Sequence, residues 1–366
     1  MARGTRNARK VWDPETVLLC LVVRTITPIY WSKFAEAPIG GSRSRRTFRF
    51  SQRKKVYSGQ TPVTRARGSR MGDGPSPTMA INLIYILVLG LVQGASELLP
   101  VSSSAHVIVV EKLLGLDPSS PEMSFVLVML HTGTMFAVVV FFWNAWGRSY
   151  FFSAEAFWQM VRNVIVATAL TAIVALALQF LIEKVVLKGG KAEIETLFSN
   201  LFVIGIALAA VAILIFIAGV SDERRPREDR EDVRLGPASV IGMVQGFCIP
   251  FRGFSRSGAT ISTGLLAGIG RRRMEEFSFA LAVVLTPPAI LRELWRLKSA
   301  HPEVASPDSL VQLALPGLLG MVASFVAGLI ALRFLSGVLE SGQWKFFSFY
   351  CAAFAIVVFA LHFMGF

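Results

Sequence analysis

Six long runs of apolar residues limit what this chain can fold into more than any other feature of its sequence. An α-helix needs about 20 mostly apolar residues to cross a bilayer, and each run approaches or reaches that length. The runs are residues 125–142, 164–182, 197–220, 277–290, 313–335 and 346–366. Charged residues make up 17% of the chain, below the about 25% of soluble domains. The sequence therefore predicts an all-α polytopic membrane protein with about six transmembrane helices.

The first 78 residues differ in composition from the rest of the chain. They contain 16 Lys and Arg against 4 Asp and Glu, whereas the remaining 288 residues contain 21 against 20. Their Ser- and Arg-rich composition is typical of disorder, and their one short apolar run is a poor match to a signal peptide. We expect residues 1–78 to be a basic leader that is disordered or lies outside the translated protein. A basic arm for nucleic acid or anionic lipid is the alternative; the membrane domain, 79–366, is expected to bind no nucleic acid.

Two shorter apolar segments are interrupted by polar residues. Residues 81–106 contain a glutamate, a proline, three serines and a histidine, and residues 240–269 contain a proline followed by a serine-rich turn around an arginine. Non-helical backbone at membrane depth survives only inside protein or beside a water-filled cavity. We therefore predict that each segment is a re-entrant helix–loop–helix pair.

These two segments also match each other. The tripeptide Val92-Gln93-Gly94 recurs 152 residues later as Val244-Gln245-Gly246. Corresponding interrupted segments are typical of transporters with a site near the midplane. If 221–234 is cytoplasmic, the cytoplasmic loops hold 11 Lys and Arg and the opposite loops 7, as the positive-inside rule requires. The two pairs then enter from opposite sides, which predicts an inverted repeat with halves at about 79–220 and 236–366.

The first polar loop predicts a cation site and a nucleophile. A carboxylate in a hydrophobic segment is costly and usually functional, and Gln93 lies one helical turn before Glu97. A carboxylate and an amide oxygen suit Mg²⁺ or Ca²⁺, so both residues are candidate metal ligands. Ser103 lies one turn before His106, and a base within reach of a hydroxyl indicates an activated nucleophile. The alternatives are a structural pair between Glu97 and Arg256, and a histidine that is only hydrogen-bonded in the core.

The remaining polar residues predict a phosphate site. Arg256 lies at the start of a half-helix, where backbone N–H groups bind anions, and its guanidinium can clamp a phosphate. Phosphoryl transfer needs mainly such positioning and charge neutralisation. His131, inside a span, either lines the cavity or is hydrogen-bonded in the core. The other predicted substrate contacts are Ser102, Ser104, Arg252, Ser255, Ser257, Gly258 and Thr260.

At these positions the chain resembles the undecaprenyl-diphosphate phosphatase family, also called the bacitracin-resistance family. Gln93 and Glu97 are similar to its E/Q-x-x-x-E motif, and residues 99–106 to its L-P-x-S-S-x-x-H motif. Residues 255–260 are similar to the end of its P-G-x-S-R-S-G-A-T motif. The resemblance spans essentially all of 79–366.

The resemblance implies an enzyme that converts undecaprenyl diphosphate to undecaprenyl phosphate, recycles the cell-wall lipid carrier and confers bacitracin resistance. It implies an interdigitated inverted-repeat fold in the bacterial inner (plasma) membrane, a site facing the periplasm, and dependence on Mg²⁺ or Ca²⁺. By position it implies a metal or phosphate-site carboxylate at Glu97, a nucleophile at Ser103, a base at His106 and a phosphate clamp at Arg256. The expected partners are a polyprenyl diphosphate and membrane lipids, and a homodimer is also allowed.

Two positions depart from the family pattern. Phe251 and Arg252 lengthen the second motif, which makes Arg252 a candidate second phosphate contact, and Gln93 replaces a charged ligand. From another functional class, a transporter or flippase of a lipid phosphate or anion would need no Ser–His pair. The S-R-x₅-H pattern of type 2 phosphatidic-acid phosphatases is excluded, because Ser262 occupies the histidine position.

Overall fold

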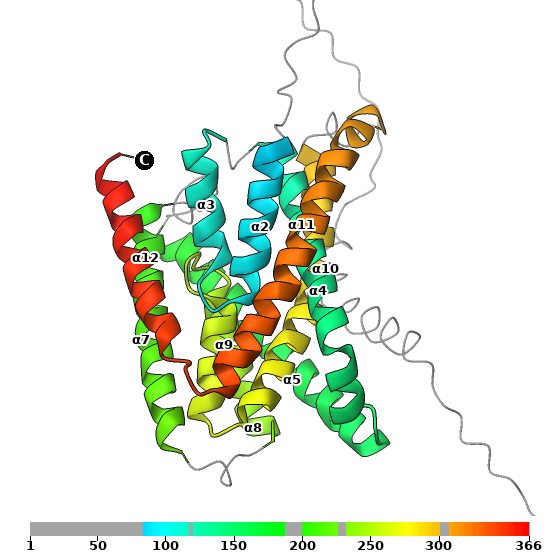
Figure 1. Cartoon of the computed structure of the whole chain (residues 1–366), viewed down its shortest axis with the longest axis vertical. Helices are drawn as coiled ribbons and strands as arrows, with labels where there is room; N and C mark the ends of the chain where they lie inside the picture. Colours follow the sequence, from blue (N-terminus) through cyan, green and yellow to red (C-terminus); the bar gives the residue numbers. More distant parts are fainter. Residues whose placement is uncertain (1–82, 117–119, 187–199, 226–231, 301–306, 366) are drawn as a thin grey trace, which may run out of the picture. The chain divides into compact units, whose positions relative to one another are not determined.

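Helices make up most of the part of the chain that the structure describes (Figure 1). The structure is a computed structural model that describes residues 83–116, 120–186, 200–225, 232–300 and 307–365. The leader predicted at 1–78 lies outside the described residues. The helices are α2 (Leu83–Leu98), α3 (Ser103–Leu113), α4 (Pro121–Ser149), α5 (Ala154–Leu181), the π-helix η1 (Ile182–Val186), α7 (Leu201–Arg224), α8 (Leu235–Cys248), α9 (Arg256–Leu266), α10 (Arg271–Ala300), α11 (Pro307–Glu340) and α12 (Phe346–Phe363).

Six of the helices in the described part of the chain are long and apolar enough to cross a membrane. They fall on the six apolar runs, so the prediction of an all-α polytopic membrane protein is confirmed. The ends of the helices were less predictable, because caps rather than hydropathy determine them. Helix α5 begins at Ala154, well before its apolar run, where the Ser153 hydroxyl accepts a hydrogen bond from the Ala156 N–H at 3.1 Å.

The two pairs of shorter helices, α2–α3 and α8–α9, occupy the interrupted apolar segments. In Figure 1 the turn between α2 and α3 lies near mid-height of the helices, above α9. The two loops are joined directly, since the Ser257 hydroxyl donates to the Leu99 carbonyl at 3.1 Å. Polar loops from both segments therefore meet inside the protein, as irregular backbone at membrane depth must. Re-entrant insertion and the inverted orientation stay predictions.

The first helix of each short pair packs closely on a long helix from the other predicted half of the chain. Helix α2 lies against α11, and α8 lies against α5. A Cβ atom on Gly94 would meet the backbone of Ser324, and one on Gly246 would lie 2.6 Å from the Thr171 carbonyl oxygen. Gly94 and Gly246 are corresponding residues of the predicted repeat. Small residues at such contacts let membrane helices approach backbone to backbone, and both halves use this device at the same place.

A methyl group at Gly246 should therefore loosen the α5–α8 contact. We expect Gly246→Ala to lower the free energy of unfolding by about 1–3 kcal/mol, the usual cost of overpacking. The matched control is Gly147→Ala in α4, where an added Cβ meets no atom within 4 Å. Unfolding midpoints in detergent test this expectation, and equal midpoints for the two variants would contradict it.

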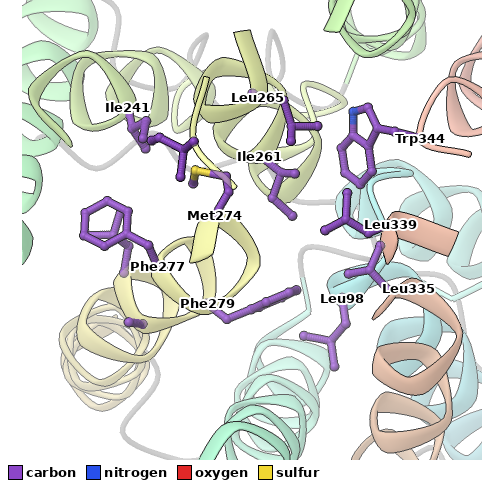
Figure 2. Packing of buried hydrophobic residues seen from close by; sticks show 14 of the residues in the cluster. Leu98, Ile241, Ile261, Leu265, Met274, Phe277, Phe279, Leu335, Leu339 and Trp344 are labelled. Carbon is purple, nitrogen blue, oxygen red and sulfur yellow. The ribbon is translucent and has the colours of Figure 1, made fainter. Parts of the chain in front are cut away.

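One apolar cluster holds the ends of both polar loops. The members labelled in Figure 2 come from α2, α8, α9, α10 and α11 and from the turn before α12. Leu98, next to Glu97, is 1% exposed, and Ile261 in α9 is fully buried. Packing of Leu98 fixes the end of α2, and packing of Ile261 fixes the first turns of α9. The polar residues between these anchors are consequently held in place by the core.

Candidate active site

The loop between α2 and α3 turns sharply at Ser102. Its φ is +69°, the only positive φ of a non-glycine residue in the described part of the chain. Such a conformation costs roughly 1–3 kcal/mol and persists only when neighbouring contacts impose it. Here the Ser102 carbonyl lies 2.8 Å from Nδ1 of His106, and its side chain makes no capping hydrogen bond. The turn folds the start of α3 back, so that Ser103 reaches the carboxylate of Glu97.

Glu97 lies at the centre of the site. The Ser103 hydroxyl donates to Oε2 of Glu97 in a short hydrogen bond. Gln93 Nε2 donates to the same oxygen at 3.2 Å, and Arg256 Nη2 donates to Oε1 at 3.2 Å. His131 Nε2 lies 3.9 Å from Oε2. A largely buried carboxylate is thus held by one guanidinium and two neutral donors, and one of those donors is a hydroxyl that it can deprotonate.

The start of α9 forms the second wall of the site. The Ser255 hydroxyl caps the helix by accepting from the Gly258 N–H at 3.2 Å, as serine often does at this position. Arg256 follows directly and projects to Glu97. A cavity of about 190 Å³ lies between the two loops. It is lined by Ser96, Glu97, Ser102, Ser103, Ser104, Cys248, Ile249, Phe251, Arg252, Phe254, Ser255, Arg256 and Ser257.

Arg256 has one nitrogen that the protein does not use. Nη1 is buried and has no hydrogen-bond partner among the described residues, although Nη2 is paired with Glu97. Nearly all buried polar groups in proteins are paired, and an unpaired one costs about 1–3 kcal/mol. Arg256 lines the cavity, so we expect its guanidinium to pair with a phosphate bound there. The structural ion pair weighed as an alternative is therefore present, and it leaves the arginine able to bind an anion.

His106 does not face Ser103. Its Nε2 lies 2.7 Å from the Tyr350 hydroxyl, its Nδ1 bonds to the Ser102 carbonyl, and its ring stacks on Phe354 at 3.9 Å between centroids. It is also absent from the cavity lining. In this structure the Ser103 hydroxyl donates its hydrogen bond to Glu97, not to the histidine predicted from the spacing. Tyr350 and Phe354 belong to α12, so local sequence gave no sign of this contact.

Three other predicted site residues lie behind the cavity wall. Thr260 donates to the Arg256 carbonyl at 2.9 Å, and its hydroxyl lies 2.6 Å from the buried Ser278 hydroxyl. Gly258 and Gln93 do not line the cavity either, and Gln93 is 1% exposed. These residues support the site through Arg256, Ser255 and Glu97. In this geometry they do not touch a molecule in the cavity.

The side chains at the cavity fit a cation that is bound partly by the protein and partly by a substrate phosphate. The described residues contain no group of three or more His, Cys, Asp or Glu side chains that could hold a metal ion. Glu97 is the carboxylate at the cavity, and Gln93 directs its amide nitrogen, not its oxygen, toward it. Magnesium is commonly bound by one or two carboxylates together with substrate phosphates. Glu97 suits that arrangement, whereas the predicted contribution of Gln93 is not favoured.

The fold and this site define a multi-pass helical membrane protein with a cavity lined by a serine, a glutamate and an arginine. Residues 86–357 match the family described as bacitracin resistance protein BacA. The chain belongs to this family.

Its relatives match across the whole membrane domain. Undecaprenyl-diphosphatase 2 of Acinetobacter baylyi is 53% identical over 285 residues, which cover 77% of this chain and 99% of that protein. An undecaprenyl-diphosphatase of Korarchaeum cryptofilum is 32% identical over 77% of this chain and 100% of that protein. One of Bacteroides fragilis is 31% identical over 74% of this chain and 95% of that protein.

Proposed function

We propose that this chain hydrolyses undecaprenyl diphosphate to undecaprenyl phosphate and inorganic phosphate, which returns the lipid carrier to cell-wall synthesis and confers resistance to bacitracin. Family membership and the names of the relatives support this activity. The observation on which the site assignment rests is the buried, unpaired Nη1 of Arg256, next to a serine already hydrogen-bonded to a carboxylate. An arginine clamp and a nucleophile with its base are the parts that phosphoryl transfer requires.

The geometry suggests a two-step reaction. Ser103 Oγ attacks the terminal phosphorus while its proton passes to Glu97. The bond between that phosphorus and the bridging oxygen breaks, and undecaprenyl phosphate leaves with the bond electrons. Water then attacks the phosphoserine, Glu97 returns its proton to Ser103, and the protons of the water leave with inorganic phosphate. Arg256 stabilises the charge on the phosphoryl oxygens in both steps.

A divalent cation is part of the same proposal. Glu97 and the diphosphate oxygens would hold Mg²⁺ or Ca²⁺, which would neutralise charge on the phosphates. Arg252 lines the cavity and is proposed as a second cationic contact. Ser102, Ser104, Ser255 and Ser257 also line it and supply hydroxyl groups for phosphate oxygens.

We further propose that the protein lies in the bacterial inner membrane with the cavity open to the periplasm. The excess of basic residues in the loops assigned to the cytoplasm supports this orientation. Membrane lipids surround the apolar helices, and a homodimer is the assembly that we propose to test by cross-linking.

Release of phosphate from undecaprenyl diphosphate tests the proposed function. Purified protein in detergent is expected to release phosphate, to lose this activity in excess chelator, and to regain it when Mg²⁺ or Ca²⁺ is added. Full turnover in excess chelator would exclude the cation. Tight binding of undecaprenyl diphosphate without any release of phosphate would exclude hydrolysis and favour a transporter or flippase of the lipid.

A further inference from the structure

The cavity is large enough for a phosphate head group but not for a polyprenyl lipid. Pockets that enclose drug-sized molecules have volumes of about 300–1,000 Å³, and this one has about 190 Å³. The prenyl chain must therefore leave the cavity between its walls. One wall is apolar and consists of Cys248, Ile249, Phe251 and Phe254. Ile249 is 56% exposed and Phe247 is 43% exposed, so this wall continues to the outer face of α8.

The two residues that lengthen the second motif, Phe251 and Arg252, lie in a well-defined turn on this wall. The Phe254 N–H donates to the Phe251 carbonyl at 3.1 Å, which closes a four-residue turn. Gly253, the third residue, has φ +101°, the conformation that favours glycine at this position. Its N–H donates to the Ser104 hydroxyl at 3.3 Å. The inserted residues are thus fixed to the loop that contains Ser103.

Phe251 belongs to an aromatic cluster with Phe247 and Phe254. The Phe247 and Phe251 ring centroids are 4.9 Å apart, and those of Phe247 and Phe254 are 5.6 Å apart with edge-to-face packing. Phe254 packs against the main core, whereas Phe251 packs against none of the described apolar clusters. Its ring lines the cavity instead, and the core does not depend on it.

We propose that Phe251 and Arg252 form a subsite for the junction between the diphosphate and the prenyl chain. This proposal rests on the proposed function, because hydrolysis places the terminal phosphate at Ser103 and Arg256. The rest of the molecule then extends to the open apolar wall. Arg252 binds the phosphate attached to the lipid, and the rings of Phe251 and Phe247 contact the first isoprene units. Phe251 and Arg252 thus favour diphosphates that have a branched apolar chain.

Kinetics with two substrates test the subsite. The variants are Phe251→Ala, Phe251→Leu and the control Phe152→Ala, whose ring is 70% exposed in the turn after α4. The substrates are undecaprenyl diphosphate and methyl diphosphate, which has no prenyl chain. For Phe251→Ala we expect KM for the lipid to rise about tenfold or more, as loss of a buried ring predicts, and kcat/KM for methyl diphosphate to fall far less. Phe251→Leu should recover part of the loss, and Phe152→Ala should match the parent on both substrates.

Two results would overturn the proposal. Equal losses on both substrates would show that Phe251 only supports the loop, and unchanged KM for the lipid in Phe251→Ala would show that its ring does not touch the chain. Arg252→Gln provides an independent check, because it should weaken both substrates, which share the diphosphate. If the parent hydrolyses neither substrate, the proposed function fails. The affinities of the parent and of Phe251→Ala for undecaprenyl diphosphate then test the subsite independently of hydrolysis.

Discussion

Glu97→Gln is expected to lower kcat for undecaprenyl diphosphate by about 10²–10⁴-fold, the usual contribution of a general base. The carboxylate accepts the hydrogen bond of the Ser103 hydroxyl, and an amide of the same shape cannot take its proton. The substitution also removes the charge paired with Arg256 at 3.2 Å. KM should change less than kcat, because Arg256 remains available to the phosphate. Steady-state kinetics at saturating Mg²⁺ or Ca²⁺ measure both quantities.

His106→Ala is the matched comparison, because the sequence predicted this histidine as the base. Its ring nitrogens bond to Tyr350 and to the Ser102 carbonyl, so we expect a smaller loss of kcat than in Glu97→Gln. The remaining loss would arise from a looser turn at Ser102. If His106→Ala were as inactive as Glu97→Gln while its unfolding midpoint matched the parent, the histidine would be the base and our assignment would be wrong.

The features of the fold that the bilayer imposes could be predicted from the sequence. A transmembrane helix requires a long apolar run, so six spans were visible without any knowledge of packing. The ends of the helices were not, because a cap such as Ser153 adds polar turns outside the apolar run. Which helices touch was also hidden, since the contact of Gly246 with Thr171 joins residues far apart in the sequence.

The site could be predicted where its residues act within one helical turn or one loop. Glu97 and Ser103 were both predicted as site residues, and a single turn brings their side chains together. The prediction was weaker where a distant helix supplies the partner. His106 is oriented by Tyr350, and Thr260 lies 2.6 Å from the Ser278 hydroxyl. Spacing restricts which side chains can meet, but it does not decide between a nearby partner and a distant one.

His131 shows the same limit. As a histidine within a transmembrane helix, it was assigned either to the cavity or to the core. In the structure its Nδ1 lies 2.8 Å from the Leu127 carbonyl, while its Nε2 lies 3.9 Å from Glu97. The ring is thus hydrogen-bonded within its own helix and also approaches the carboxylate of Glu97. The core interpretation is right about the hydrogen bond alone, because the side chain is 42% exposed. His131 does not line the cavity between the two loops.

Ser103→Ala should abolish almost all turnover if the reaction passes through a phosphoserine. Removal of an attacking nucleophile usually costs far more than removal of a single binding contact, so we expect kcat to fall by about 10³-fold or more. Ser96→Ala is the matched control. Its hydroxyl also belongs to a serine at the cavity, but it donates to the Val92 carbonyl at 2.5 Å within α2. Ser96→Ala is therefore expected to retain turnover close to that of the parent.

The covalent intermediate gives a second readout for the same residue. Acid quenching of the parent during turnover, with substrate labelled at its terminal phosphate, should trap label on the protein, and the label should map to Ser103. Ser103→Ala should trap none. If Ser103→Ala instead retains substantial turnover and the parent traps no label, water attacks the phosphorus directly. Glu97 would then deprotonate that water, and the hydroxyl of Ser103, which now points to Glu97, would only bind a phosphate oxygen.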